Sequence, residues 1–331
     1  MSFDKEIKHI LLESPRFIND NLLIEVYRYQ YAFNSVYKEF ADAVHRSPEK
    51  VKTLKDIPFL PITFYKNRDI KTQDGTINFF NAIEFYSSGT TSANRSTHRV
   101  ADPEFYKQRS QQIFESYYGS LKDVVIIAVL PSYEENPSSS LIFMMKHFIS
   151  ETAHEASGFY SFDIPRIKAL LRALSSENKK VLVWGVSYAL LDWAEAETES
   201  YSNILFLETG GMKGRRKELT RIELHTKLCT GFGGTTIHSE YGMTELLSQA
   251  YSMGEGLYQF PEGLIPILRQ INDPFEKVVQ GSGGINLIDL ANINACCFIE
   301  TQDVGRISGE RFEILGRIDT SDMRGCNLLY M

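Results

Sequence analysis

Short apolar segments alternate with amphipathic segments through the middle of the chain. The apolar segments have the length and β-branched character of buried strands, and they are residues 124–130, 180–184 and 203–208. The predicted helices are residues 139–150, 165–174, 187–196 and 218–228. This alternation predicts an α/β fold, mostly parallel and doubly wound, with helices on both faces. Ligands bind such sheets where loops leave the carboxyl ends of the strands.

The region before this alternation follows other patterns. An apolar, aromatic-rich stripe predicts one long helix over residues 21–45. Pro58 and Pro61 remove two backbone donors, so we expect residues 57–62 to form a connector and not a central strand. Residues 83–86 are predicted to form a short strand.

Glycine punctuates the chain after about residue 255. The densest run, residues 281–284, precedes an apolar strand at residues 285–290, and this region predicts a smaller β-rich C-terminal part. The 331 residues allow two ordinary domains or one large α/β unit.

Composition and charge exclude several classes of protein. With 43% hydrophobic and 23% charged residues, disorder, collagen and coiled coil are excluded. A net charge of −7 repels the phosphate backbone of nucleic acids. The longest apolar run, residues 124–130, is far shorter than the ~20 residues that span a bilayer, and residues 1–8 lack the features of an export signal. We therefore expect a cytoplasmic protein without a nucleic-acid partner or a membrane span.

Four cysteines occur, at positions 229, 296, 297 and 326, without the spacing of a zinc site. We expect reduced thiols. Cys296 and Cys297 lie in an apolar stretch and are predicted to be buried. Cys326 differs, because it stands near Arg324 close to the end of the sequence.

A hydroxyl-rich loop follows the predicted strand at residues 83–86. Residues 87–92 place five hydroxyl side chains around Gly89, and the backbone N–H groups of such a turn can form a nest for phosphate oxygens. The loop lacks the Gly-Lys-Ser/Thr of a Walker A motif, and a plain Ser/Thr turn remains an alternative.

A second loop, residues 185–189, resembles a nucleophile elbow centred on Ser187. Asp192 is too close to Ser187 to orient a histidine, which leaves Glu208 or Glu223 as less usual acids. We therefore expect Ser187 to be a helix N-cap.

A basic cluster lies shortly after these segments. A solvated helix face is the expected structure, and attraction of an anionic cofactor or protein is the alternative. The cluster is Lys213, Arg215, Arg216, Lys217 and Arg221.

Tyr241-Gly242-Met243-Thr244-Glu245 follows a predicted strand at residues 237–240. Its aromatic ring, glycine turn, hydroxyl and carboxylate could contact a base, a phosphate and Mg²⁺. Five residues alone are modest evidence for a nucleotide site, so the interpretation depends on whether other motifs accompany them.

Read in order, five motifs resemble the successive core motifs of the adenylate-forming superfamily, which comprises the acyl-CoA and aryl-CoA ligases and their relatives. These motifs are residues 86–92, 210–211, 241–245, 301–303 and 316–319. Further segments resemble the acyl-protein synthetase (LuxE-type) branch, which activates an acid and carries it on a cysteine. They are residues 57–61, 130–133, 138–141 and 324–328. Phenylacetate-CoA ligases, which share the Tyr-Gly-Met-Thr-Glu stretch, are the next most similar.

The resemblance implies a role for each motif. The residues that would hold the ATP phosphates are Ser87, Ser88, Gly89, Thr90 and Thr91. Gly210 and Gly211 would let the backbone approach adenine, and Tyr241, beside Gly242, would stack on it. Thr244 would bind the α-phosphate, and Glu245 would ligate Mg²⁺. The ribose would be held by Asp303 and Arg317, and Cys326 would accept the acyl group.

The sequence also departs from the superfamily pattern. The phosphate loop ends without the usual Gly-Lys, and Gln302 replaces the glycine of the ribose motif. The sequence extends only 12 residues beyond Asp319, so we expect the small C-terminal lid domain, with its catalytic lysine, to be missing or vestigial.

We therefore predict an adenylate-forming large domain at residues 1–315, followed at residues 316–331 by a hinge-like motif and a short tail that carries Cys326. The predicted function is the activation of a carboxylic acid, such as a fatty acid, with ATP and Mg²⁺, and transfer of the acyl group to Cys326. An acyl reductase, a thioesterase or an acyl-carrier protein would be the partner. The alternatives are an acyl- or aryl-CoA ligase with a separately encoded lid, and a degenerate nucleotide-binding subunit without catalysis.

Overall fold

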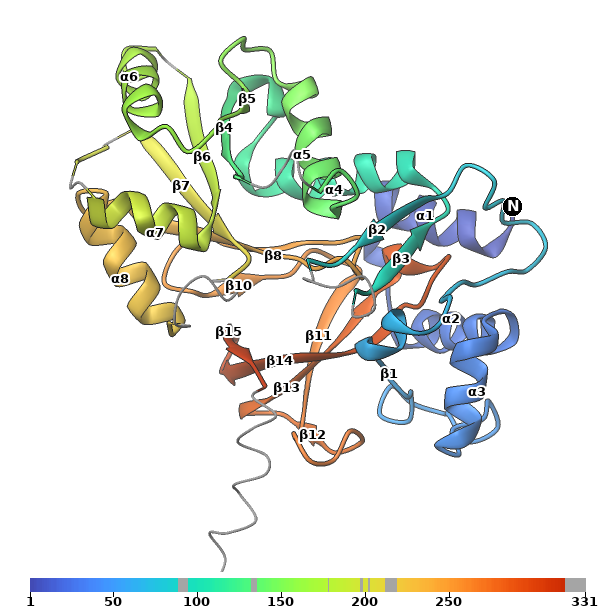
Figure 1. The fold of residues 1–331 in the computed structure, drawn as a ribbon. Helices are drawn as coiled ribbons and strands as arrows, with labels where there is room; N and C mark the ends of the chain where they lie inside the picture. Colours follow the sequence, from blue (N-terminus) through green and yellow to red (C-terminus); the bar gives the residue numbers. More distant parts are fainter. Residues whose placement is uncertain are drawn as a thin grey trace, which may run out of the picture.

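The computed structural model describes residues 1–88, 95–131, 136–177, 179–196, 199–201, 203–211 and 219–318. These residues form a seven-stranded sheet, a six-stranded sheet and a two-stranded hairpin (Figure 1). No helix in this part of the chain is long and apolar enough to cross a bilayer.

The seven-stranded sheet has the strand order β10-β9-β8-β7-β6-β4-β5. The strands are β4 Val124–Val129, β5 Gly158–Phe159, β6 Lys180–Val186, β7 Ile204–Thr209, β8 Ile237–Tyr241, β9 Ala250–Ser252 and β10 Tyr258–Gln259. Strands β5, β4, β6, β7 and β8 are parallel, and β9 and β10 are antiparallel. The predicted alternation of strands and helices is therefore confirmed.

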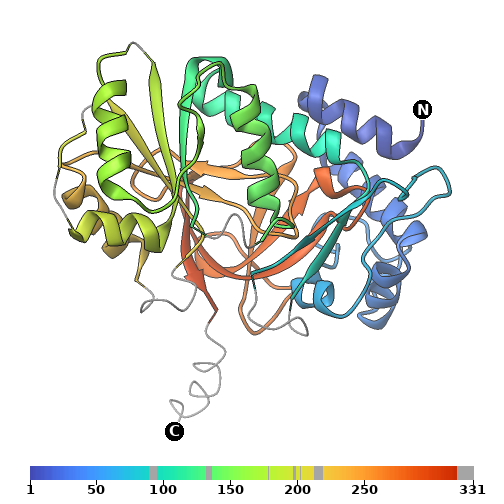
Figure 2. The ribbon, with the colours of Figure 1, turned by 45° about the horizontal axis from the view of Figure 1, so that its top comes forward.

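Helices cover both faces of this sheet (Figures 1 and 2). They are α4 Pro103–Tyr118, α5 Ser140–Glu151, α6 Ile164–Leu174, α7 Ser187–Ala196 and α8 Arg221–Gly231. On one face, the Trp184 ring of β6 lies 5.9 Å from Phe114 of α4 and 6.2 Å from Phe148 of α5. On the other face, Phe206 of β7 lies 5.8 Å from Trp193 of α7. Large apolar rings thus fill both layers of the core.

The six-stranded sheet is antiparallel except at one edge, where β1 runs parallel to β14. Its strands are β1 Leu60–Pro61, β11 Leu264–Arg269, β12 Lys277–Val278, β13 Gly281–Asp289, β14 Phe298–Ser308 and β15 Arg311–Arg317. The β-rich C-terminal part is confirmed, but the glycine run lies inside β13 and not before the strand. A Cβ on Gly284 would clash with the Arg269 guanidinium, so glycine is required within this strand.

The predicted helix over residues 21–45 is wrong, because two helices occupy this region. The N-terminal helices are α1 Phe3–Glu13, α2 Asp20–Phe33 and α3 Ser35–Ala43. Asn34 interrupts the pattern with an extended backbone (φ −115°, ψ 103°), and its side-chain oxygen accepts from the Tyr37 N–H at 2.9 Å. Its amide also donates to the Ala295 carbonyl at 2.8 Å, so a buried tertiary contact stabilises the break.

Shorter elements complete the described fold. The hairpin consists of β2 Ile83–Tyr86 and β3 Thr97–Val100, and the 3₁₀ helices are η1 Pro15–Phe17, η2 Ile62–Lys66, η4 Leu121–Asp123 and η5 Leu290–Asn292. As expected, the proline-containing connector forms no central strand, because β1 lies at a sheet edge. Cys296 and Cys297 are fully buried, which confirms that prediction.

Candidate functional site

Most of the predicted site residues that the structure describes lie near the carboxyl ends of β7 and β8. Thr209 of β7 pairs with Glu240 of β8, so Gly210 leaves its strand beside Tyr241. Gly210 has a φ of +74°, in the left-handed region that favours glycine. Gly210 and Gly242 are exposed and Gly211 is partly exposed, so backbone is open to solvent at this edge.

Tyr241, Asp303 and Arg317 come together from different sheets. The Tyr241 hydroxyl donates to an Asp303 carboxylate oxygen at 2.7 Å, and Arg317 Nε lies 3.8 Å from the other oxygen. Burial raises the pKa of Asp303, although the Tyr241 hydrogen bond and Arg317 oppose that shift. The Arg317 side chain is 88% exposed, so it is available to a ligand.

The hairpin places the base of the predicted phosphate loop beside Glu245. Ser87 and Ser96 close this base, since the Ser87 N–H donates to the Ser96 carbonyl at 3.0 Å and the Ser96 N–H to the Ser87 hydroxyl at 2.8 Å. The buried Glu245 carboxyl hydrogen-bonds with the Ser96 side chain, and burial raises its pKa. Ser88 is exposed, whereas Gly89, Thr90 and Thr91 lie outside the described residues.

Buried side chains hold the backbone of Thr244 and Glu245 from behind. His98 Nδ1 lies 2.8 Å from the Thr244 carbonyl oxygen, and burial lowers the pKa of His98 to about 4. The ring is therefore neutral at pH 7, with Nδ1–H as the donor. Asn292 donates its amide to the Glu245 carbonyl at 2.8 Å. Both carbonyls are thus fixed, and the Thr244 side chain is left partly exposed.

Asp289 holds the next residues of the same turn. One of its carboxylate oxygens accepts from the backbone N–H groups of Leu247 and Ser248 at 2.9 and 3.1 Å. The other accepts from the Ser248 hydroxyl at 2.8 Å and the Ala291 N–H at 3.1 Å. This fully buried carboxylate therefore orders the chain immediately after Glu245.

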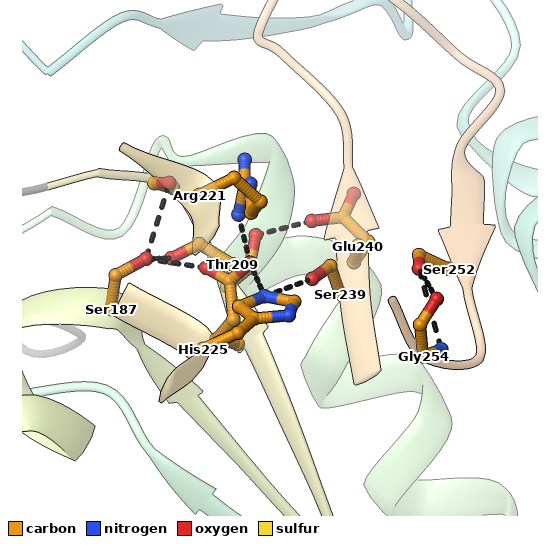
Figure 3. A network of polar contacts seen from close by, with 10 residues as sticks. Ser187, Thr209, Arg221, His225, Ser239, Glu240, Ser252 and Gly254 are labelled. Carbon is orange, nitrogen blue, oxygen red and sulfur yellow. Dashed lines mark hydrogen bonds and ion pairs between the residues drawn. The ribbon is translucent and has the colours of Figure 1, made fainter. Parts of the chain in front are cut away.

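A set of polar side chains, here called the Glu208 network, links β7 and β8 to the helices α7 and α8, and Figure 3 labels most of its members. It consists of Glu208, Arg221, His225, Ser187 and Ser239. The Glu208 carboxylate accepts from the Arg221 guanidinium and, at 2.6 Å, from the Ser187 hydroxyl. His225 Nε2 lies 3.4 Å from the same carboxylate and 3.0 Å from the Ser239 hydroxyl. Burial favours a higher pKa for Glu208, but Arg221, His225 and Ser187 together outweigh it and lower the pKa to about 2.

This network bears on two predictions. Ser187 begins α7, at the helix end where a cap was predicted, but its hydroxyl donates to Glu208 and to the carbonyls of Thr209 and Gly210. This hydroxyl is fully buried, whereas a nucleophile elbow, the disfavoured alternative, exposes its oxygen to substrate. Arg221 was expected on a solvated helix face, but it ion-pairs with the buried Glu208 and stacks 5.9 Å from the Tyr258 ring. The other members of the basic cluster, residues 213–217, lie outside the described residues.

A second set, here called the Glu240 group, lies on the α4–α5 face of the same strands. It consists of Glu240, Thr209 and Gln249. The Thr209 hydroxyl donates to the Glu240 carboxylate (Figure 3), and Gln249 Oε1 has no hydrogen-bond partner in the described part of the chain. Burial, with a contribution from nearby Glu208, raises the pKa of Glu240 to about 7.

The residues present fit a Mg²⁺ ion that arrives with nucleotide. Mg²⁺ keeps several waters and takes one or two carboxylates together with substrate phosphates, rather than a cage of protein ligands. Glu245 supplies one buried carboxylate, which hydrogen-bonds with the Ser96 side chain and experiences the charge of Arg317. Those residues contain no cluster of three or more His, Cys, Asp or Glu side chains able to hold a metal.

Sequence reasoning did not identify several members of this region. His98, Asp289 and Asn292 lie far from Thr244 in sequence, so no local signal places them behind it. His225 and Glu240 also received no role, although Glu240 directly precedes the Tyr-Gly-Met-Thr-Glu motif. A charged side chain at the end of a buried strand was the available signal. The predicted acceptor Cys326 lies outside the described residues.

Searches by sequence and by structure give different results. A scan against protein-family models finds no match, and a search of curated proteins finds no similar sequence. Solved structures of acyl-CoA ligases do match the fold. A 2-hydroxyisobutyryl-CoA ligase in complex with 2-HIB-AMP and CoA is 12% identical, with 97% of this chain and 70% of that chain covered and a TM-score of 0.59.

Two further ligases are similar over part of their length. The long-chain-fatty-acid-CoA ligase FadD1 from Archaeoglobus fulgidus is 15% identical over 75% of this chain and 53% of its own, with a TM-score of 0.51. ATP-bound MatB from Rhodopseudomonas palustris is 17% identical over 71% and 47%, with a TM-score of 0.49. The chain thus spans about half the length of these two ligases. The fold of this chain is similar to that of the large domain of acyl-CoA ligases.

Proposed function

We propose that this chain is an adenylate-forming enzyme that activates a carboxylic acid with ATP and passes the acyl group to a thiol. One observation carries the proposal: the base of the phosphate loop lies beside Glu245, and Asp303 and Arg317 lie beside Tyr241, so these groups meet at residues 241–245. The similarity of the fold to acyl-CoA ligases supports the same conclusion.

The chemistry follows from the weak reactivity of a free carboxylate. The acid's oxygen attacks the α-phosphorus of ATP, the bond to the β-phosphate oxygen breaks, and pyrophosphate leaves. In the proposed arrangement, Thr244 binds the α-phosphate, Tyr241 contacts the base, and Asp303 and Arg317 contact the ribose. Mg²⁺ held by Glu245 would supply charge neutralisation at the phosphates. Residues His98 and Asn292 keep Thr244 and Glu245 in place.

In the second step a thiolate attacks the acyl carbon, and AMP leaves. We propose the acyl-protein synthetase reaction, with Cys326 as the acceptor. Cys296 and Cys297 are unsuited to this role, because burial raises the pKa of the Cys296 thiol to about 12 and raises that of Cys297 well above its ordinary value. Arg324 stands two residues before Cys326 in the sequence, which supports this acceptor, since a nearby cation stabilises a thiolate.

Coenzyme A is the second candidate acceptor, and the fold similarity to acyl-CoA ligases favours it. The two acceptors give different products. Coenzyme A releases a soluble thioester, whereas Cys326 retains the acyl group on the protein.

Acid-dependent exchange of labelled pyrophosphate into ATP tests the first step. Exchange should occur with at least one acid of a broad panel. Glu245→Gln should reduce it by at least a hundredfold, because the Mg²⁺ that would offset the phosphate charge loses its carboxylate ligand. Glu313→Gln, at an exposed ion pair on β15, is the matched control and should exchange like the wild type. ATP binding without exchange would favour a degenerate nucleotide-binding subunit.

Labelled acid tests the acceptor. Cys326→Ala should retain pyrophosphate exchange and lose the covalent acyl label, and Cys229→Ala should retain both. If the label survives in Cys326→Ala, the acceptor assignment is wrong. Release of a thioester only when coenzyme A is present would instead identify the ligase reaction.

A further inference from the structure

The Glu240 group lies next to the segment proposed to contact the α-phosphate. A Cβ on Gly242 would clash with the Glu240 carboxylate and would lie 3.5 Å from the Gln249 side chain. Both side chains therefore pack against the exposed backbone of Gly242, two residues before Thr244. An acid whose carboxylate reaches the α-phosphate at Thr244 must place its first carbons close to this point.

The hydrogen-bonding capacity of the Glu240 group is incompletely used. Glu240 is 6% exposed, and in the described part of the chain its carboxylate accepts from the Thr209 hydroxyl. Gln249 is 3% exposed, and its Oε1 has no partner among the residues that the structure describes. A buried acceptor without a donor is costly, as for the Gln249 oxygen, and a carboxylate can accept more hydrogen bonds than the one that Glu240 receives from Thr209, so a ligand group that donates would suit both side chains.

On the opposite face of the strands, Glu208 is a carboxylate with several hydrogen-bond and ion-pair partners. Glu208 already has a guanidinium, an imidazole and a hydroxyl, so it has little capacity left for a ligand. The surroundings of Glu240 differ, since its cross-strand neighbour Tyr251 also has a hydroxyl without a described partner. Among the described residues, two oxygen atoms near Glu240 therefore lack a donor or acceptor, the Gln249 Oε1 and the Tyr251 hydroxyl.

We propose that the acid activated here carries a hydrogen-bond donor, a hydroxyl or an amino group, close to its carboxylate, and that Glu240 and Gln249 bind this donor. This inference rests on the proposed function. It narrows the substrate from carboxylic acids in general to hydroxy or amino acids, and it disfavours a plain fatty acid. A simple alkyl chain would cover Glu240 and Gln249 without giving either a donor.

The test compares acids that share a carbon skeleton. Pyrophosphate exchange is measured with the full chain, ATP and Mg²⁺, using short alkanoic acids and their 2- and 3-hydroxy and 2- and 3-amino derivatives. The wild type should show at least tenfold higher kcat/KM for a substituted acid than for its unsubstituted parent. Parents turned over within threefold of every derivative would overturn the proposal.

Variants assign the preference to Glu240. Glu240→Ala should bring the ratio of substituted to parent kcat/KM close to one, while Glu313→Gln should leave it unchanged. Glu240→Gln keeps an acceptor oxygen without the charge, so it should retain a preference for a hydroxy acid and lose one for an amino acid. A ratio that survives in Glu240→Ala would overturn the assignment, and thermal unfolding of each variant verifies its fold.

Binding measured by calorimetry separates this inference from the proposed function. A derivative that binds wild type at least tenfold more tightly than its parent, with loss of that difference in Glu240→Ala, supports the inference even if no exchange occurs. Exchange with parents and derivatives alike would leave the enzyme proposal standing and overturn this one. Equal or undetectable binding without exchange would overturn both.

Discussion

Two glutamates at the carboxyl ends of neighbouring strands illustrate two treatments of a buried charge. Glu208 of β7 faces α7 and α8, where Arg221, His225 and Ser187 together lower its pKa to about 2. Glu240 of β8 faces the opposite layer, where burial raises its pKa to about 7. Within the described residues, the first carboxylate has a guanidinium, an imidazole and a hydroxyl as partners, whereas the second has the Thr209 hydroxyl, and we propose that a ligand binds it. Neighbouring residues of one sheet edge can therefore serve stability and recognition separately.

Removing the cation from the Glu208 network should have the largest effect. Arg221→Met leaves a fully buried carboxylate without its ion pair, so the free energy of unfolding should fall by about 3–5 kcal/mol. Urea denaturation at pH 7 measures this. Arg306→Met, at an exposed ion pair, is the matched control and should cost less than ~1 kcal/mol. Similar losses in the two variants would contradict the distinction.

The pH dependence of stability should reveal Glu240. Its folded pKa of about 7 exceeds the ordinary value of 4.5, so the folded state binds a proton that the unfolded state releases between these values. Stability from this group should therefore decline as pH rises from 4.5 to 7, by about 3 kcal/mol in all.

Glu240→Gln isolates this contribution. The variant cannot ionise, so its free energy of unfolding relative to wild type should increase between pH 4.5 and pH 7, as measured by urea denaturation at several pH values. Glu313→Gln should show no such trend. A parallel pH profile for Glu240→Gln and wild type would show that Glu240 does not titrate in this window.

The smallest effect should come from the hydroxyl that serves Glu240. Thr209→Val removes the donor without much change in volume, and it should cost about 1–2 kcal/mol at pH 8, where the carboxylate is charged. The cost should be smaller at pH 5, where Glu240 is protonated. Chemical denaturation at both values tests this, and an equal cost at the two values would argue against the hydrogen bond.

The layered fold could be predicted because each strand carries its own signal. Residues 124–129 are apolar throughout, as expected for a strand buried on both faces, and they form β4. The break at Asn34 could not be predicted in the same way. Its amide donates to the carbonyl of Ala295, 261 residues away, so the local helical pattern contained no information about it.

The candidate site likewise has features that could be predicted from the sequence and features that could not. The sequence by itself determined the alternating α/β core and the motifs after its strands, because periodicity and turn chemistry are local properties. Only the tertiary structure decided that Asp289 orders the residues after Glu245, that Tyr241 pairs with Asp303, and that Arg221 pairs with the buried Glu208. These contacts depend on how two sheets and their helices pack, and burial then determines which charges are paired and which remain free to bind.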